Sequence, residues 1–199
     1  MIRLNLGVFA SHGGSNMQAV ADACRSGELN AKVCVVICNN ADAYVLKRAL
    51  NENIPCYHLS GGKYPDERQL DKAMIEVLDR HSVDTVILAG YMKKLGHGVL
   101  RKYRGRILNI HPALLPKHSG KGMYGKYVHE AVIDSGDKVT GVTVHLVDEG
   151  YDTGKIINQC EMEVLPDDTA DTLAKRVLEK ENVFYVETLK MICEGKIKL

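Results

Sequence analysis

Short apolar runs alternate with helical patterns through the first half of this 199-residue chain. The strand-like runs lie at residues 4–10, 32–38, 56–59, 84–89 and 106–110, and the helical patterns at 16–25, 43–52 and 66–81. Strands and helices that alternate at these lengths predict right-handed βαβ units, in which helices cover a parallel sheet. The expected fold class is therefore α/β, with a Rossmann-like, mostly parallel sheet flanked by helices.

The second half of the chain departs from this alternation. Residues 139–147 and 155–164 are strand-like and are joined by a glycine-rich turn, which predicts an antiparallel hairpin. From Thr169 to about Cys193, apolar residues recur at helical spacing, which predicts one long amphipathic helix. No linker rich in proline, glycine or serine divides the chain, so we expect a single domain over residues 1–199.

The near-neutral net charge of the chain argues against partners that bind through a strong overall field. Lys and Arg number 26 against 25 Asp and Glu, so no overall field attracts nucleic acid or an anionic membrane, and an anionic ligand must be held locally. The first residues lack the pattern of a secretory signal, and no stretch approaches the ~20 apolar residues of a membrane span, so we expect a cytoplasmic protein. The six cysteines form no Cys-x-x-Cys pair, and we expect them to be reduced core residues without a metal.

Three patterns could carry chemistry, and the first is the turn around Gly14, Ser15 and Asn16. It follows an apolar strand and opens a helix, so that backbone N–H groups and the helix dipole point at whatever lies beyond, as suits a phosphate. The same residues fit a plain turn in which Ser15 or Asn16 caps the helix. The pattern alone leaves both interpretations open.

The second pattern is Asn109 and His111, which end the strand-like run 106–110 just before a proline. Strand alternation places both side chains on the same side, and the end of a parallel strand is where such sheets bind ligands. An amide donor beside an imidazole suits stabilisation of an oxyanion together with proton transfer. An isolated pair of this kind also fits side chains that satisfy the backbone of a loop.

The third pattern is the acidic turn from Asp148 to Gly154. Aspartate and glycine are ordinary turn residues, but a carboxylate brought to His111 would fix its tautomer and raise its pKa. Spacing leaves open whether Asp148 or Asp152 could do this. Separately, Glu181 falls inside the apolar stripe of the long helix, which is unusual for a carboxylate unless its head reaches the surface, is paired or serves a site.

The chain resembles the folate-dependent formyltransferases. The resemblance rests on the Gly-Ser-Asn turn, on Leu88-Ala89-Gly90-Tyr91-Met92, on the run from Leu108 to Pro116 that contains Asn-Ile-His-Pro-Ala-Leu-Leu-Pro, and on Asp152-Thr153-Gly154. It spans about residues 8–181. It implies direct transfer of a formyl group from 10-formyltetrahydrofolate to the amine of glycinamide ribonucleotide, a step in purine biosynthesis, with no metal and no covalent enzyme intermediate.

The resemblance also implies roles for particular residues. Asn109 would donate to the formyl oxygen, His111 would donate a proton and stabilise charge, and Asp152 would raise the pKa of His111. The phosphate would lie on the Gly14 turn and the ribonucleotide against Glu181. The folate would contact the cofactor-binding residues Arg68, Met92, Lys93, Lys94, Leu95, Asn109 and Asp148.

Three local features differ from the family pattern. Lys93 stands where the family usually has arginine, and Arg68 is one position from the arginine that commonly faces the glutamate tail of the folate. The loop 117–125 also differs, and its three glycines predict a mobile lid.

The resemblance assigns phosphate binding to about residues 1–100 and catalysis with folate binding to about 101–199. The partners expected are therefore small molecules, with a monomer or a homodimer as the assembly. Three other functions stay open. A formyltetrahydrofolate deformylase would pass the formyl group to water, a methionyl-tRNA formyltransferase would have a further domain, and a module that binds nucleotide or folate would have lost the chemistry.

Overall fold

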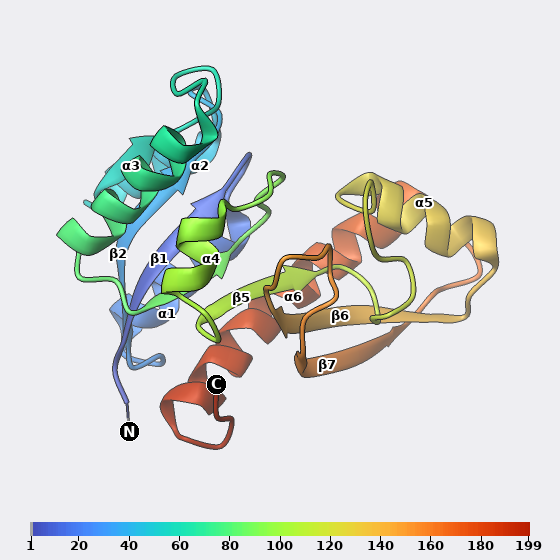
Figure 1. The fold of residues 1–199 in the computed structure, drawn as a ribbon. Helices are drawn as coiled ribbons and strands as arrows, with labels where there is room; N and C mark the ends of the chain where they lie inside the picture. The colour runs from blue at the N-terminus through green and yellow to red at the C-terminus, as the bar shows by residue number, and fades with distance from the viewer. Residues whose placement is uncertain (1) are drawn as a thin grey trace.

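The computed structural model describes residues 2–199 as a regular succession of strands and helices (Figure 1). The strands are β1 (Leu4–Ala10), β2 (Ala31–Cys38), β3 (Cys56–His58), β4 (Thr85–Leu88), β5 (Ile107–His111), β6 (Val139–Leu146) and β7 (Ile156–Glu163). They form one sheet in the order β3-β2-β1-β4-β5-β6-β7. The first five strands are parallel and the last two are antiparallel, which confirms the predicted α/β fold with its hairpin.

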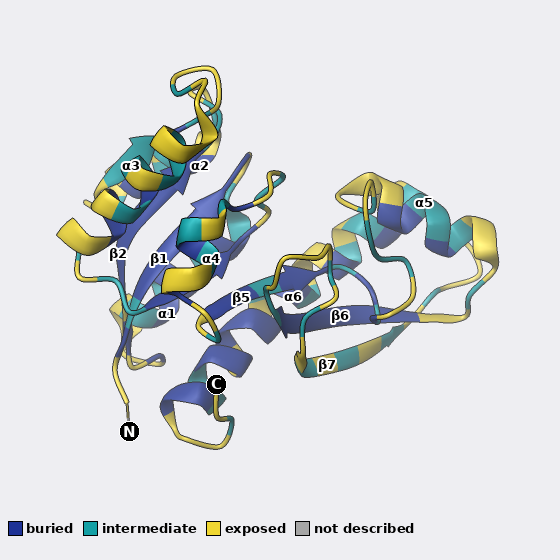
Figure 2. Ribbon diagram, viewed as in Figure 1, coloured by how far each residue is buried: buried dark blue, intermediate teal, exposed yellow. Residues whose placement is uncertain are grey.

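Six helices connect and cover these strands. They are α1 (Ser15–Ser26), α2 (Tyr44–Asn51), α3 (Glu67–Arg80), α4 (His97–Lys102), α5 (Lys126–Ser135) and α6 (Ala170–Cys193). One hydrophobic cluster joins the sheet to α1, α2, α5 and α6, and a second joins it to α3 and α4. The sheet is thus buried between two layers, and Figure 2 shows the resulting continuous burial of its central strands.

The central strands are apolar on both faces because both faces are covered. Every residue of β1 except Asn5 is buried, as is every residue of β4. The last strand, β7, alternates between half-buried and exposed residues because it lies at the edge of the sheet. Burial therefore follows the position of each strand in the sheet.

The long helix α6 links distant parts of the chain. Tyr185 is fully buried, and its hydroxyl donates to the carbonyl oxygens of Leu108 (3.1 Å) and Leu88 (3.3 Å). The helix begins with a capping box between Thr169 and Thr172. Tyr185 thus connects α6 by hydrogen bonds to β4 and β5, close to the strand ends where ligands bind in such folds.

The sequence did not predict α4 or α5. Both are short and lie next to glycines, which masks the helical period in the sequence. The start of α4 depends on a distant residue, because the Asp71 carboxylate of α3 accepts from the N–H groups of Gly98 (2.6 Å) and Val99 (3.1 Å). Such a tertiary cap has no local signal.

Two other observations concern the whole described chain. The six cysteines are free thiols, three of them buried and three half-buried. Within residues 2–199, no helix has both the length and the apolar character that spanning a membrane requires.

Candidate active site

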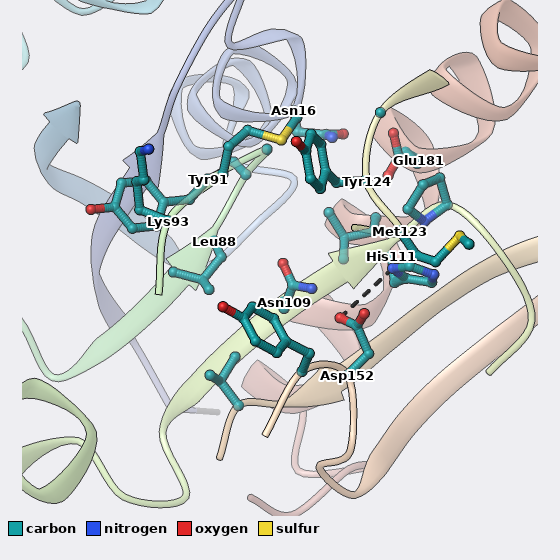
Figure 3. Close-up of a pocket in the computed structure, with 18 of the residues that line it drawn as sticks. Asn16, Leu88, Tyr91, Lys93, Asn109, His111, Met123, Tyr124, Asp152 and Glu181 are labelled. Atoms are coloured by element: carbon teal, nitrogen blue, oxygen red, sulfur yellow. Dashed lines mark ion pairs between the residues drawn. The ribbon is translucent and has the colours of Figure 1, made fainter. Parts of the chain in front are cut away.

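A cavity of about 800 Å³ opens at the ends of β1, β4 and β5. Its walls come from the β1–α1 turn, from residues 88–95 and 109–112, from the loop before α5, from the turn after β6 and from α6. Three tyrosines also line it, namely Tyr91, Tyr124 and Tyr151. Figure 3 shows Asn109, His111 and Asp152 together inside this cavity, with Asn16 and Glu181 on another part of its wall.

The β1–α1 turn presents backbone N–H groups to the cavity. Gly14 precedes the helix with a left-handed backbone (φ 73°), and no side chain caps the helix, so neither Ser15 nor Asn16 is the N-cap. The turn is held by α2, where the Val45 N–H donates to His12 O (3.0 Å) and Arg48 Nε donates to Gly13 O (2.9 Å). The first N–H groups of any helix lack intrahelical partners, and no side chain caps those of α1. Because Gly14, Ser15 and Asn16 line the cavity, these N–H groups are available at its wall.

Asn109 is oriented by a histidine from the neighbouring strand. Asn109 and His145 are paired across β5 and β6, and Asn109 Nδ2 lies 3.0 Å from His145 Nε2. His145 Nδ1 lies 2.8 Å from the carbonyl oxygen of Leu146, which can only accept. In the tautomer with the proton on Nδ1, His145 accepts from Asn109 through Nε2, and the second amide hydrogen of Asn109 is left for a ligand.

His111 faces Asp152, not Asp148. His111 Nδ1 lies 3.7 Å from Asp152 Oδ1, which is also 3.5 Å from His145 Nε2. The carboxylate of Asp148 instead accepts from the Gly150 N–H (2.9 Å) and the Thr153 hydroxyl (2.7 Å) inside its own turn. Of the two aspartates that spacing left open, the structure brings Asp152 to the imidazole.

The electrostatics of this pair differ in part from the expectation. Burial lowers the pKa of His111, and although the charge of Asp152 acts upward as predicted, burial is the larger effect and the net pKa is lowered. Burial alone would raise the pKa of Asp152, but His145, His111 and the Gly120 N–H together hold it below its ordinary value. The pair therefore rests as a neutral imidazole beside a carboxylate at neutral pH.

A second polar group lies near α6. Glu181 is buried, which raises the pKa of its carboxyl to about 8, while the amide of Asn16 acts the other way. Burial also lowers the pKa of His129 to about 4, with a smaller contribution from the charge of His111. Asn16 Oδ1 and His129 Nδ1 are buried without a hydrogen-bond partner. This wall of the cavity thus has unused hydrogen-bonding capacity.

The predicted folate residues divide into two sets. Met92, Lys93, Lys94, Leu95, Asn109 and Asp148 line the cavity, whereas Arg68 lies in the first turn of α3, outside the lining. The Ser11 hydroxyl accepts from the Met92 N–H (2.8 Å), which ties this segment to the end of β1. The ammonium of Lys94 lies 5.6 Å from the centre of the Tyr151 ring. These contacts join two walls of the cavity mouth.

The loop 117–125 contacts the central pair directly. His111 Nε2 lies 2.9 Å from the carbonyl oxygen of His118, and the Gly120 N–H donates to Asp152 Oδ2 (3.1 Å). The mobility of this loop stays a prediction, but its backbone contacts both members of the pair.

Sequence reasoning missed three histidines, His118, His129 and His145. His145 interrupts an apolar strand, which is a usable signal, whereas His129 lies on a helix that was not predicted. His118 contacts His111 through its backbone carbonyl, which its residue type does not indicate. Among residues 2–199, no group of three or more His, Cys, Asp or Glu side chains is arranged to hold a metal ion.

Comparison of the sequence with known proteins shows which family the chain resembles. The formyl transferase family model matches residues 4–189. The phosphoribosylglycinamide formyltransferase of Arabidopsis thaliana, described as chloroplastic, is 41% identical over 98% of this chain and 68% of its own length. That of Haemophilus influenzae is 37% identical over 98% of this chain and 89% of its own length.

Solved structures agree with these matches. Glycinamide ribonucleotide transformylase 1 of Symbiobacterium toebii superposes with a TM-score of 0.91 at 39% identity, over 100% of this chain and 91% of its own. A formyltetrahydrofolate deformylase of Pseudomonas syringae has a TM-score of 0.87 at 24% identity and is covered over 63% of its length, which shows a shared fold only. The match to the family model and the curated relatives show that the chain belongs to the formyl transferase family.

Proposed function

We propose that this protein transfers the formyl group of 10-formyltetrahydrofolate to the primary amine of glycinamide ribonucleotide. The family uses this folate as its formyl donor, and the similar proteins named above are phosphoribosylglycinamide formyltransferases. The observation that carries the proposal is that one cavity contains both the helix N-terminus at Gly14 and the group of Asn109, His111 and Asp152. A phosphate held at the first would place the rest of the nucleotide near the second.

The proposed reaction is direct. The amine attacks the formyl carbon, the bond from that carbon to the folate nitrogen breaks, and one proton passes from the amine to the departing nitrogen. The products are the formylated ribonucleotide and tetrahydrofolate. The protein must therefore stabilise the negative oxygen of the tetrahedral intermediate and move one proton.

Asn109 stabilises the oxygen in this proposal. Its amide keeps one hydrogen on His145 and directs the other into the cavity. A donor that is already oriented costs little reorganisation when the charge develops, and loss of one such donor typically lowers kcat by about 10²–10³-fold.

His111 and Asp152 move the proton. A neutral imidazole can accept the proton of the attacking amine, and the resulting imidazolium is stabilised by the Asp152 carboxylate 3.7 Å away. The imidazolium then stabilises the oxyanion and donates the proton to the departing folate nitrogen. The lowered pKa of His111 favours this return of the proton.

The two substrates would enter from different walls. The phosphate lies on Gly14, Ser15 and Asn16, and Glu181, whose carboxyl is hydrogen-bonded to Asn16, contacts the ribonucleotide. The folate lies against Met92, Lys93, Lys94, Leu95 and Asp148. Arg68 would reach only the distal end of a glutamate tail, because it lies outside the cavity lining.

The experiment follows the absorbance of the folate product when the purified protein meets 10-formyltetrahydrofolate with and without glycinamide ribonucleotide. Turnover that requires the ribonucleotide and falls by at least about 10²-fold in His111→Ala would support the proposal. Turnover without the ribonucleotide would identify a deformylase. Binding without turnover would identify a module that has lost the chemistry.

A further inference from the structure

The tautomer of His111 is determined by a hydrogen bond to the loop 117–125, and not by Asp152. Its Nε2 lies 2.9 Å from the carbonyl oxygen of His118, and a carbonyl can only accept. The neutral imidazole therefore carries its proton on Nε2, which leaves the lone pair of Nδ1 on the side of Asp152. The proposed chemistry needs this arrangement, because Nδ1 must be free to take a proton.

The backbone of His118 is unusual for a residue with a side chain. Its φ is 49°, in the left-handed region that only a few per cent of non-glycine residues adopt, with asparagine, aspartate and histidine the commonest among them. Such a conformation costs of order 1 kcal/mol or more and persists only when the surroundings impose it. A hydrogen bond made by the side chain of His118 outside the loop supplies such support.

That contact is Asp137, which lies between α5 and β6. His118 Nε2 is 2.9 Å from Asp137 Oδ2, and both side chains are largely shielded, with 15% and 21% exposed. The same carboxylate accepts from Lys117 Nζ (3.2 Å), whose side chain is 70% exposed. The side chain of His118 thus joins the loop to the body of the protein.

We propose that His118 is a positioning residue, whose side chain, bonded to Asp137, holds its own carbonyl on His111 Nε2 and so keeps Nδ1 facing Asp152 and the formyl group. This inference rests on the proposed function for its kinetic part. The structure supports it through two successive hydrogen bonds: His111 Nε2 donates to the carbonyl oxygen of His118, and His118 Nε2 donates to the carboxylate of Asp137. Two residues further along the same loop, the Gly120 N–H orients Asp152.

The kinetic test compares His118→Ala, Asp137→Ala and the double variant. Loss of the anchor frees the imidazole to rotate, and we expect kcat to fall by roughly 10- to 100-fold while both KM values change by less than about threefold. The double variant should be no worse than the more damaged single variant, because both substitutions break the same connection. Asp137→Asn keeps an acceptor for His118 and should retain most of the rate.

Lys117→Ala is the matched control. It removes the other partner of the same carboxylate, but its side chain is exposed and does not lead to His111. We expect its kcat to equal that of the wild type. Additive losses in the double variant, or an equal loss in Lys117→Ala, would overturn the proposal.

A spectroscopic test is independent of activity. In protein labelled with ¹⁵N-histidine, the wild-type His111 should show a protonated Nε2 and an unprotonated Nδ1, and His118→Ala should show a mixture of tautomers. A pure Nε2–H tautomer in both proteins would overturn the inference whatever the enzyme does. Failure of the wild type to turn over, with the tautomer shift present, would overturn only the proposed function.

Discussion

The protonation of a single carboxyl group, that of Glu181, connects the candidate site to stability. Its pKa is raised by burial from 4.5 to about 8, so the folded chain binds this proton more tightly than the unfolded chain does. The contribution to stability is then present at low pH and is lost as pH rises between these two values. Ionisation of Glu181 is therefore expected to weaken the fold progressively from about pH 4.5 to about pH 8.

We predict that Glu181→Gln removes this dependence. A single group of this kind can contribute a slope of at most about 1.4 kcal/mol per pH unit to the free energy of unfolding. Urea unfolding of the wild type and of Glu181→Gln at several pH values checks this, with the exposed Glu179→Gln as the control. Parallel pH dependence in the wild type and Glu181→Gln would contradict the prediction.

At the scale of single residues, the sequence identified as site candidates those polar residues that stand at strand ends or break an apolar pattern. Asn109, His111 and Glu181 were found in this way, and all three line the cavity. The choice between Asp148 and Asp152 needed the course of a turn, which spacing does not give. The net pKa of His111 was not predictable either, because it depends on how much protein covers the ring.

At the scale of elements, the conformation of the β1–α1 turn and its packing against α2 depend on Gly14, the residue before α1. Gly14 has a left-handed backbone, and a Cβ there would collide with the side chain of Val45 in α2. Gly13, one residue earlier, has nothing within 4 Å of the position that a Cβ would take. The two neighbouring glycines are thus a matched pair for a test.

We predict that Gly14→Ala lowers the free energy of unfolding by roughly 1–3 kcal/mol, because the new methyl group overpacks the contact with α2. It should also raise the KM for the ribonucleotide, since the N–H groups at the start of α1 move. Gly13→Ala should change neither quantity appreciably. Denaturant unfolding and steady-state kinetics measure both, and equal effects of the two substitutions would contradict this account.

The cap of α4 allows a second prediction at this scale. Asp71→Ala removes the carboxylate that accepts from Gly98 and Val99, and we expect a loss of about 0.5–2 kcal/mol in the free energy of unfolding. Asp71→Asn, which keeps one acceptor oxygen, should lose less. Equal stability of Asp71→Ala and the wild type in urea would show that α4 does not depend on this cap.

Elements with long apolar runs were predictable, and those made by contacts distant in sequence were not. The run at 4–10 became β1, and the hairpin strands became β6 and β7, because burial dictates their composition. The helices α4 and α5 have six and ten residues, too few for a clear helical period beside glycines.

At the scale of the molecule, one sheet runs through both halves of the chain. β4 pairs with β5 across the boundary near residue 100, and α6 packs on α1 and bonds both of these strands through Tyr185. The expected halves, about 1–100 and 101–199, are thus joined by the sheet and by this helix.

We therefore predict one cooperative unfolding transition for the whole chain. Far-UV circular dichroism and tyrosine fluorescence should give coincident urea curves, and a fragment of residues 1–100 should show no such transition. Two separate transitions would contradict the single-domain prediction.

The tyrosines that line the cavity allow ligand binding to be followed by intrinsic fluorescence. The chain contains no tryptophan, and Tyr91, Tyr124 and Tyr151 stand on the walls where the proposed folate would lie. Intrinsic emission therefore comes from tyrosine alone, and a bound pteridine ring would quench the residues nearest to it. One tryptophan introduced at Tyr124 would give a unique fluorophore in the loop that contacts His111, so that arrival of ligand and motion of the loop could be timed separately.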